Sequence, residues 1–434
     1  MESWIDRQDL AELDFEALET TARRSALLLA ARIIERYVNA DQSDHSAAHV
    51  VCSCGRPARY AGRRSKRIQS ALGEMHLERA YYHCSDCQAG FAPRDRSLGM
   101  EHSSESPAVV RMIGTVGALV SFQEGSSLLA ELAGLTVDAK QVERVAERLG
   151  AEIARDEKQN CDALETAPLP KTLYLGMDGT GIAMRPQELV GRSGKQADGS
   201  AKTREVKLCT VWSAEAHDPH GTAVRDPGSV TYSAAIESAA SADPSQRAAF
   251  TERVLREATR RRFSQAQRRV VLGDGAPWIW NIAHELFPGS IQIVDRFHAQ
   301  QHLSDLSKAL YGPTSSAAAR WAKRRHQDLD AGKFDALLRA ISRHLSANPE
   351  ARLCLNYFKT NRHRMGYPQF HVQGLCTSTG VVEAGCKVAI GTRLKRAGMH
   401  WTLHGSNAII ALRCCRLSGR FQDFWERRSE NRAA

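Results

Sequence analysis

The chain has 434 residues, more than one compact core can hold, and its length predicts two to four domains. Its 59 basic and 49 acidic residues give a formal net charge of +10, which favours a nucleic-acid partner, although an ordinary solvated surface could carry the same excess. The longest apolar run near the N-terminus, 26–31, is far shorter than a bilayer span and follows an acidic leader, so we expect neither a membrane anchor nor secretion.

The first predicted domain, 1–48, is a helical segment. Leu28 and Ala31 give it an apolar face, and Arg32 and Glu35 give it a charged face. Such a helix could dimerise, but packing within the chain is the simpler interpretation. A polar linker is expected to end this segment.

A zinc ribbon is predicted over 49–100. Its candidate ligands are two cysteine pairs on tight turns: Cys52, Cys54, Cys84 and Cys87. Four thiolates close a tetrahedral Zn²⁺ site and leave no open position, so the ion would be structural. The chain has 11 cysteines, an odd number, and only these four have metal-ligand spacing. This pattern argues against a disulfide framework and favours the reducing cytoplasm.

The ligand set of the zinc ribbon is open at one point. The first pair is Cys-x-Cys instead of Cys-x-x-Cys, so His76 or His83 could replace one cysteine. The alternative interpretation is that the four cysteines are incidental core residues.

A helical, helix-turn-helix-like DNA-binding domain is predicted over 101–168. The first helix, 123–133, stops at Gly134, and Asp138 caps a second helix with Gln141 at the capping-box position. The second helix carries a basic stripe of Lys140, Arg144 and Arg148. This stripe could contact DNA phosphates or enter a groove, but a solvated helix face interrupted by acidic residues explains it equally well.

An α/β catalytic core is predicted over 169–298. Its expected strands are 173–184, 206–212, 229–236, 269–273 and 290–294, with helices after the third and fourth. This element order is that of an RNase H-like fold, a mixed sheet in which the first and fourth strands are neighbours. Adjacent strand ends would place Asp178 beside Asp274.

Three carboxylates are the candidate catalytic residues. Asp178 and Asp274 each end an apolar, strand-like run, and Glu383 opens a basic helical stretch. Carboxylate oxygens suit Mg²⁺ (or Mn²⁺), and two such ions about 3.5–4 Å apart activate the attacking oxygen and neutralise the leaving oxygen in phosphoryl transfer. Each Asp-Gly pair could instead be only a turn signal.

Asp295 competes with Asp274 as a metal ligand because it follows the fifth strand. Together with His298 and His302 it places polar groups on one side of a helix start. These groups could support the metal ligands or touch DNA, and a purely structural pairing of histidine with aspartate is the alternative.

The rest of the chain is predicted to be helical. A helical insertion, 299–376, precedes the Glu-bearing helix and basic C-terminal helices of 377–434. The candidate DNA contacts in this last part are Arg393, Lys395, Arg396 and Trp401. Trp401 could stack on an unpaired base or equally be a buried core residue.

Several motifs, in the same order from about residue 50 to about 425, resemble those of the ISKra-type insertion-sequence transposases, relatives of the Mutator-like DDE transposases. They are the zinc ribbon leading into Arg-Ala-Tyr-Tyr-His-Cys, Gly176-Met-Asp-Gly-Thr-Gly181, Arg204-Glu-Val-Lys-Leu208, Gly273-Asp-Gly-Ala-Pro-Trp-Ile-Trp280, Val294-Asp-Arg-Phe-His298 and Thr379-Gly-Val-Val-Glu-Ala-Gly-Cys-Lys387. This resemblance implies that Asp178, Asp274 and Glu383 form the DDE triad.

The same resemblance implies the activity. A bacterial mobile element's transposase would bind terminal inverted repeats as a dimer or larger assembly, close to the nucleoid. With Mg²⁺ it would cut DNA to free a 3′-hydroxyl and join that hydroxyl to target DNA. Two other functions stay open: a zinc-ribbon DNA-binding regulator with an inactive RNase H-like domain, and a metal-dependent nuclease that only cuts.

Overall fold

A computed structural model describes residues 14–101, 103–161, 168–194, 196, 199–219, 223–346, 348–378 and 380–433. The chain divides into two compact units, one of residues 1–149 and 422–434 and one of residues 150–421. No helix in the described part of the chain is both long enough and apolar enough to cross a membrane.

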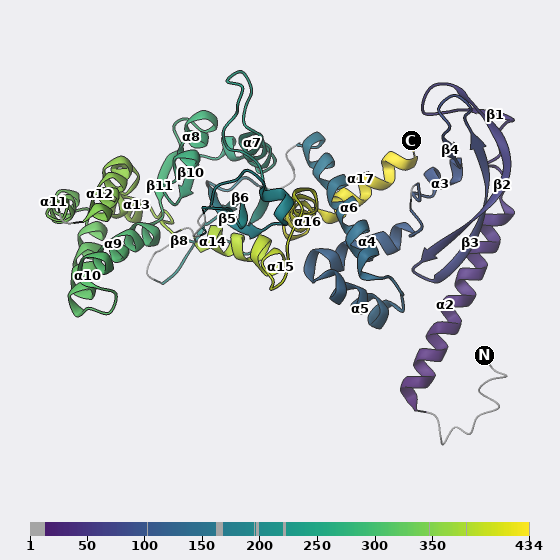
Figure 1. The fold of residues 1–434 in the computed structure, drawn as a ribbon, viewed down its shortest axis with the longest axis horizontal. Coiled ribbons are helices and arrows are strands. Elements are labelled where there is room, and N and C mark those ends of the chain that lie inside the picture. The colour runs from purple at the N-terminus through teal and green to yellow at the C-terminus, as the bar shows by residue number, and fades with distance from the viewer. Residues whose placement is uncertain are drawn as a thin grey trace. The chain divides into compact units, whose positions relative to one another are not determined.

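The first unit contains a four-stranded antiparallel sheet and several helices (Figure 1). The strands, in the sheet order β1-β2-β3-β4, are β1 (His49–Val51), β2 (Pro57–Ser70), β3 (Gly73–His83) and β4 (Gly90–Phe91). The helices are α2 (Phe15–Ala40), α3 (Pro93–Ser97), α4 (Pro107–Leu119), α5 (Phe122–Ala133), α6 (Ala139–Gln159) and α17 (Phe421–Ala433). Residues 1–13 of the expected N-terminal helical segment lie outside the described residues.

The predicted turn between α5 and α6 is confirmed. Gly134 ends α5 with a φ of 68°, in the left-handed region that glycine adopts without strain. Asp138 caps α6, since its Oδ1 accepts a hydrogen bond of 2.8 Å from the backbone N–H of Gln141. The Gln141 side chain does not close a capping box, because it donates to the carboxylate of Glu105 instead.

The second unit is built on a five-stranded mixed sheet of order β11-β10-β5-β6-β9. The strands are β5 (Thr172–Ala183), β6 (Thr203–Ser213), β9 (Thr231–Ala235), β10 (Arg268–Gly273) and β11 (Ile291–Val294). β6 is antiparallel to β5 and β9, and β10 is parallel to β5 and β11. All five predicted strands form, and the first and fourth are neighbours as expected. A small hairpin of β7 (Ala216–His217) and β8 (Ala223–Val224) was not predicted.

Helices cover both faces of this sheet (Figure 1). They include α7 (Ala249–Arg260), α8 (Pro277–Leu286), α14 (Gly380–Gly385), the π-helix Cys386–Gly391, α15 (Thr392–Leu394) and α16 (Leu403–Leu417). The expected helical insertion consists of α9 (Arg296–Tyr311), α10 (Ser316–Asp330), α11 (Phe334–Ser342), α12 (Pro349–Asn361) and α13 (Tyr367–Val372). Short 3₁₀ turns lie at Pro186–Leu189, Phe263–Gln265 and Arg362–Arg364.

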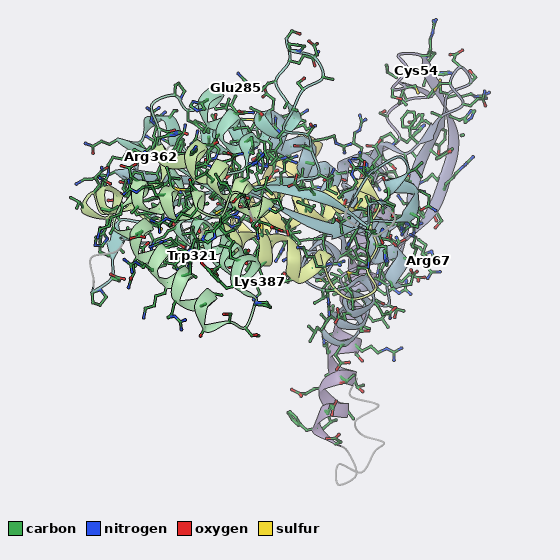
Figure 2. The ribbon with its side chains drawn as sticks, turned by 60° about the vertical axis from the view of Figure 1, so that its left-hand side comes forward. Cys54, Arg67, Glu285, Trp321, Arg362 and Lys387 are labelled. Atoms are coloured by element: carbon green, nitrogen blue, oxygen red, sulfur yellow. The ribbon has the colours of Figure 1, made fainter. Side chains whose placement is uncertain are left out.

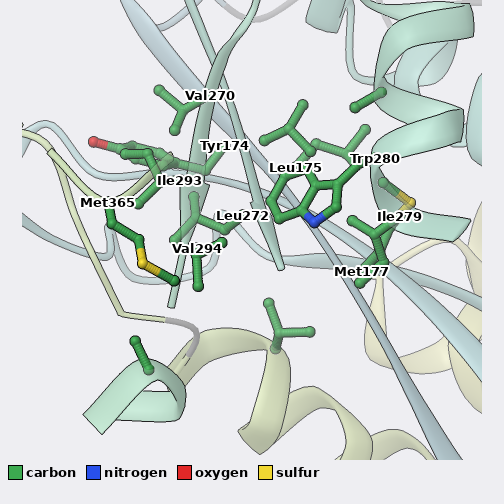
Figure 3. Close-up of a cluster of buried hydrophobic side chains, with 14 of the residues drawn as sticks. Tyr174, Leu175, Met177, Val270, Leu272, Ile279, Trp280, Ile293, Val294 and Met365 are labelled. Carbon is green, nitrogen blue, oxygen red and sulfur yellow. The ribbon is translucent and has the colours of Figure 1, made fainter. Parts of the chain in front are cut away.

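The hydrophobic core of the second unit lies between the sheet and α8. Leu175 and Met177 alternate with residues of the opposite face along β5, and both are fully buried. They lie beside Trp280 and Ile279 of α8 (Figure 3). The same core continues into the helical insertion. The strands that carry the first two candidate carboxylates are therefore fixed from one face.

A buried ion pair also stabilises this unit. The Glu257 carboxylate is fully buried and accepts hydrogen bonds of 2.8 and 3.0 Å from Arg420. Burial alone would raise the pKa of Glu257, but the charges of Arg420 and Arg260 outweigh burial and lower it. The glutamate is therefore ionised at neutral pH.

We expect Glu257→Ala to lower the free energy of unfolding of the second unit by about 3–5 kcal/mol, because it leaves the buried Arg420 charge with Glu157 as its one remaining carboxylate partner among the described residues. Urea unfolding followed by circular dichroism measures this change. As a matched control, Glu285→Ala changes a surface residue (Figure 2). It removes an exposed ion pair with Arg247 and should cost less than about 1 kcal/mol. Equal losses in the two variants would contradict the importance of the buried pair.

Candidate functional site

The register of two parallel strands brings Asp178 and Asp274 to the same level of the sheet. Leu272 of β10 lies opposite Gly176 of β5. Asp274 lies two residues after Leu272, and Asp178 lies two residues after Gly176. Because the two strands are parallel, the two carboxylates lie side by side at the same sheet edge. The negative charge of Asp274 also acts on Asp178. The predicted proximity of this pair agrees with the strand register.

Both aspartates are held by short local hydrogen bonds. Asp178 Oδ1 accepts from the backbone N–H of Gly179 at 2.6 Å, and Asp274 Oδ1 accepts from Ala276 at 2.8 Å. Burial and the charge of Asp274 raise the pKa of Asp178, although the hydrogen bonds from Gly179 and Cys386 oppose this rise. A nearby positive charge would offset both of these effects on Asp178.

α14, which carries Glu383, packs on the strand that carries Asp178. The helix lies against β5 and β6 because Gly176 and Gly385 leave room for it. A Cβ atom at Gly176 would lie 2.2 Å from Cγ2 of Val382. Glu383 is itself exposed, so its carboxylate is accessible to a ligand.

Cys386, one helical turn after Glu383, contacts Asp178 directly. Its Sγ donates to Asp178 Oδ2 over 3.4 Å, and burial raises the pKa of this thiol, so it stays protonated and can donate. Cys386 also begins the π-helix that follows α14, and π-helical turns are frequent at functional sites. Cys386 is not among the site residues predicted from the sequence; the available signal is its spacing of three residues from Glu383.

The three carboxylates are less tightly clustered than the zinc-ribbon cysteines. Among the described residues, only the four cysteines form a group of three or more ligands whose atoms all lie within 4.8 Å of one another. Asp178, Asp274 and Glu383 do not meet that distance. Ligands distributed over two ions about 3.5–4 Å apart need not all meet it.

Asp295 has a structural role in this conformation. Its side chain is buried, with 1% exposed, and its Oδ1 accepts from the backbone N–H of His298 at 2.6 Å, which caps α9. The His298 ring lies 5.5 Å from that of His302, whose ring lies 4.0 Å from Tyr357. The Tyr357 hydroxyl donates to the Asp274 backbone carbonyl at 2.9 Å. This chain of rings thus supports the backbone that carries Asp274.

The structure separates the predicted DNA-contacting residues of the second unit into two groups. Arg393 is fully buried, with its guanidinium 5.2 Å from the centre of the Trp401 ring. Trp401 is also buried, and its Nε1 donates to the Leu394 carbonyl. The structure therefore agrees with the interpretation of Trp401 as a buried core residue. The prediction that these two side chains face DNA is not met in this conformation, because they pack α15 onto the sheet. Lys395 and Arg396 are exposed.

The predicted basic stripe on α6 is partly neutralised. Lys140 forms an ion pair of 2.8 Å with Glu143, and Arg148 lies 3.9 Å from Glu105. Arg144 is exposed. The stripe is therefore only a moderately basic surface.

The four cysteines of the zinc ribbon converge as predicted. Two turns position them: Cys52 accepts from the N–H of Gly55 at 2.9 Å, and Cys84 donates to the Ala89 carbonyl at 2.9 Å. The Sγ atoms of Cys52 and Cys87 are 3.5 Å apart, and those of Cys54 and Cys84 are 3.7 Å apart. A tetrahedral ion with Zn–S bonds of about 2.3 Å requires about 3.8 Å, so the donor set fits Zn²⁺.

The protonation of the cluster also fits a metal ion. The backbone N–H of Cys54 lowers the pKa of Cys52 to about 6. At Cys87 the backbone N–H of Ala89 acts in the same direction, but the neighbouring thiols outweigh it and raise the pKa to about 12. Four thiolates at this distance repel one another unless a cation binds them. His76 instead pairs with Glu74, and neither His76 nor His83 belongs to the cluster.

Comparisons with known proteins complete the description. A scan against protein-family models finds no match, and no curated protein matches. Among solved structures, the "Drosophila P element transposase strand transfer complex" is similar, with a TM-score of 0.25 and 11% sequence identity, covering 80% of this chain and 82% of that chain. Similarity at this level does not by itself establish a shared activity.

We expect Gly176→Ala to destabilise the second unit by about 1–3 kcal/mol, because the added methyl group overlaps Val382 of α14. Adding Val382→Ala should restore part of the loss by removing the overlapping atom. Gly380→Ala, whose added Cβ would meet Ser378 Oγ at an ordinary 3.4 Å, is the matched control and should be close to neutral. Urea unfolding measures all three; a neutral Gly176→Ala would mean that α14 does not pack closely on β5.

We expect Cys84→Ser to abolish stoichiometric zinc binding, because one thiolate of a closed four-ligand site is lost. Elemental analysis of the purified protein by mass spectrometry measures the zinc content. Cys161→Ser, which changes a cysteine outside the cluster, should leave it at one ion per chain. Full zinc content in Cys84→Ser would exclude the four-cysteine site.

Proposed function

We propose that the protein is a DDE-type transposase of a bacterial insertion sequence, with an RNase H-like catalytic domain and Asp178, Asp274 and Glu383 as its catalytic carboxylates. The observation that carries the proposal is the parallel register of β5 and β10, which sets Asp178 beside Asp274, together with the docking of α14 against β5. The motif order noted in the sequence extends the proposal to an ISKra-type element.

Two divalent ions, Mg²⁺ or Mn²⁺, would be held by Asp178, Asp274 and Glu383, and when bound they supply charge neutralisation and an activated oxygen. The chain itself positions these ligands. The backbone N–H groups of Gly179 and Ala276 orient the two aspartates, and Cys386 fixes the second oxygen of Asp178. Glu383, which is exposed on α14, would complete the set of metal ligands.

The proposed reactions need no covalent protein intermediate. Water first attacks a phosphodiester at the end of the element and frees a 3′-hydroxyl. That hydroxyl then attacks a phosphodiester of target DNA, and the carboxylate site serves both steps. Positioning of the phosphate and stabilisation of charge are therefore the main tasks of the protein.

DNA affinity would come from the exposed basic residues. Arg144 on α6, and Lys395 and Arg396 just after α15, are exposed to solvent and would contact phosphates. Such contacts release counterions, so the affinity should fall with increasing salt concentration. The zinc ribbon and the helix-turn-helix-like pair α5–α6 are the proposed readers of the inverted repeats.

We expect Asp178→Asn and Glu383→Gln each to abolish both cutting and joining while leaving end binding within about twofold, because the metal ligands are lost but the DNA-binding surfaces are not. The assay incubates purified full-length protein with Mg²⁺ or Mn²⁺, a labelled element end and a target plasmid. Glu285→Gln, an exposed carboxylate in the same unit, is the control and should retain both reactions.

The same assay separates the other two functions. Cleavage without joined product would identify a nuclease that only cuts. Binding of the element end without cleavage would identify a DNA-binding regulator. Loss of end binding in Asp178→Asn or Glu383→Gln would contradict the assignment of these residues to the chemistry.

A further inference from the structure

The helix α2 has two apolar faces, and only one is covered by the first unit. On the inner face, Ala31 is fully buried and Val38 packs against the cluster of Ile68, Leu77 and Met100. Asn39 joins this face to β3 through two hydrogen bonds of 2.9 Å. The inner face therefore accounts for the packing role expected from the sequence.

The outer face carries large apolar side chains that solvent reaches. Leu29, Ile33 and Tyr37 follow one another at intervals of four residues, with exposed fractions of 63%, 61% and 78%. Ala26 and Ala22 continue the same line toward the N-terminus. At 3.6 residues per turn these five residues occupy an arc of about 80°, away from Ala31. We call them the outer stripe.

Scattered exposed apolar residues are ordinary, but a continuous stripe of this kind marks an interaction surface. The helix has 26 residues and is about 39 Å long, which is enough for a stable helix pair. The occupant must offer a long apolar face with small residues opposite Leu29, Ile33 and Tyr37. The outer stripe itself meets this requirement.

We propose that the outer stripe binds the outer stripe of a second copy of this chain in an antiparallel helix pair. If residues whose numbers add to 55 face each other, Leu29 meets Ala26 and Ile33 meets Ala22 of the second copy, and Tyr37 meets Leu18. Each large side chain then faces a smaller one, which lets the helices approach closely. This dimer does not depend on the proposed enzymatic function.

The charges of α2 favour the antiparallel direction. Asp14, Glu16 and Glu19 outnumber Arg23 and Arg24 by one charge in the N-terminal half. Arg32 and Arg36 outnumber Glu35 by one charge in the C-terminal half. An antiparallel pair places the acidic end of one helix along the basic end of the other, and it also opposes the two helix dipoles. A parallel pair would place like charges together and would set Tyr37 against Tyr37.

The first test is the oligomeric state of the full-length protein, freed of nucleic acid, by light scattering coupled to size exclusion. We expect a dimer of two 47.9 kDa chains. Leu29→Glu with Ile33→Glu should weaken it by more than about tenfold, because each charge would be buried unpaired. Both positions are exposed in the single chain, so the variant should keep its fold, as circular dichroism and zinc content would check.

The control is Leu353→Glu, which places the same charge at a residue with 71% exposure on α12. It should leave the dimer intact. A monomeric wild type, a dimer that survives the double substitution, or equal weakening by the control would each overturn the proposal.

The second test concerns direction. Mixing Ala22→Cys with Ile33→Cys should give a disulfide-linked dimer on a non-reducing gel, above the wild-type background of native cysteines. Leu29→Cys alone should not link to itself, because its partner position is Ala26. Self-linking at Leu29 without linking of the mixed pair would overturn the antiparallel register.

Discussion

The parallel pairing of β5 with β10 is the constraint on which the candidate active site depends. Asp178 and Asp274 are 96 positions apart in the sequence, yet a single strand register places them at one sheet edge. Burial is the main cause of the raised pKa of Asp178, and the repulsion from the Asp274 charge adds to it. The buried core between the sheet and α8 resists that repulsion by holding the strands in place.

The helix that carries the third candidate carboxylate is held against the sheet by close packing rather than by strand pairing. Gly176 and Gly385 remove the side chains that would keep α14 away from the sheet. Cys386 then contacts Asp178, so the helix that carries Glu383 is tied to the first aspartate by a hydrogen bond. A chain that lost either glycine would keep all three carboxylates but not their arrangement.

Residues of the same type differ in burial, and burial decides whether a side chain packs inside the protein or can contact a ligand. Arg393 and Trp401 lie within the packed interior, whereas Lys395 and Arg396, in the same basic stretch, are exposed. Likewise, α2 buries one row of apolar side chains against β2 and β3 and leaves the outer stripe exposed to solvent. Within one stretch of sequence, composition and spacing do not distinguish the residues that become buried from those that stay exposed. Only the packing of the folded chain separates them.

The sequence by itself determined the local features: the five strands of the sheet, the cap of Asp138, the turn at Gly134 and the four clustered cysteines. These depend on short-range periodicity, on backbone conformational preference and on ligand spacing, all of which are written in neighbouring residues. The contact of Cys386 with Asp178 and the burial of Arg393 and Trp401 became visible only in the folded chain. Each of these outcomes depends on contacts between segments distant in the chain, for which local sequence carries no signal.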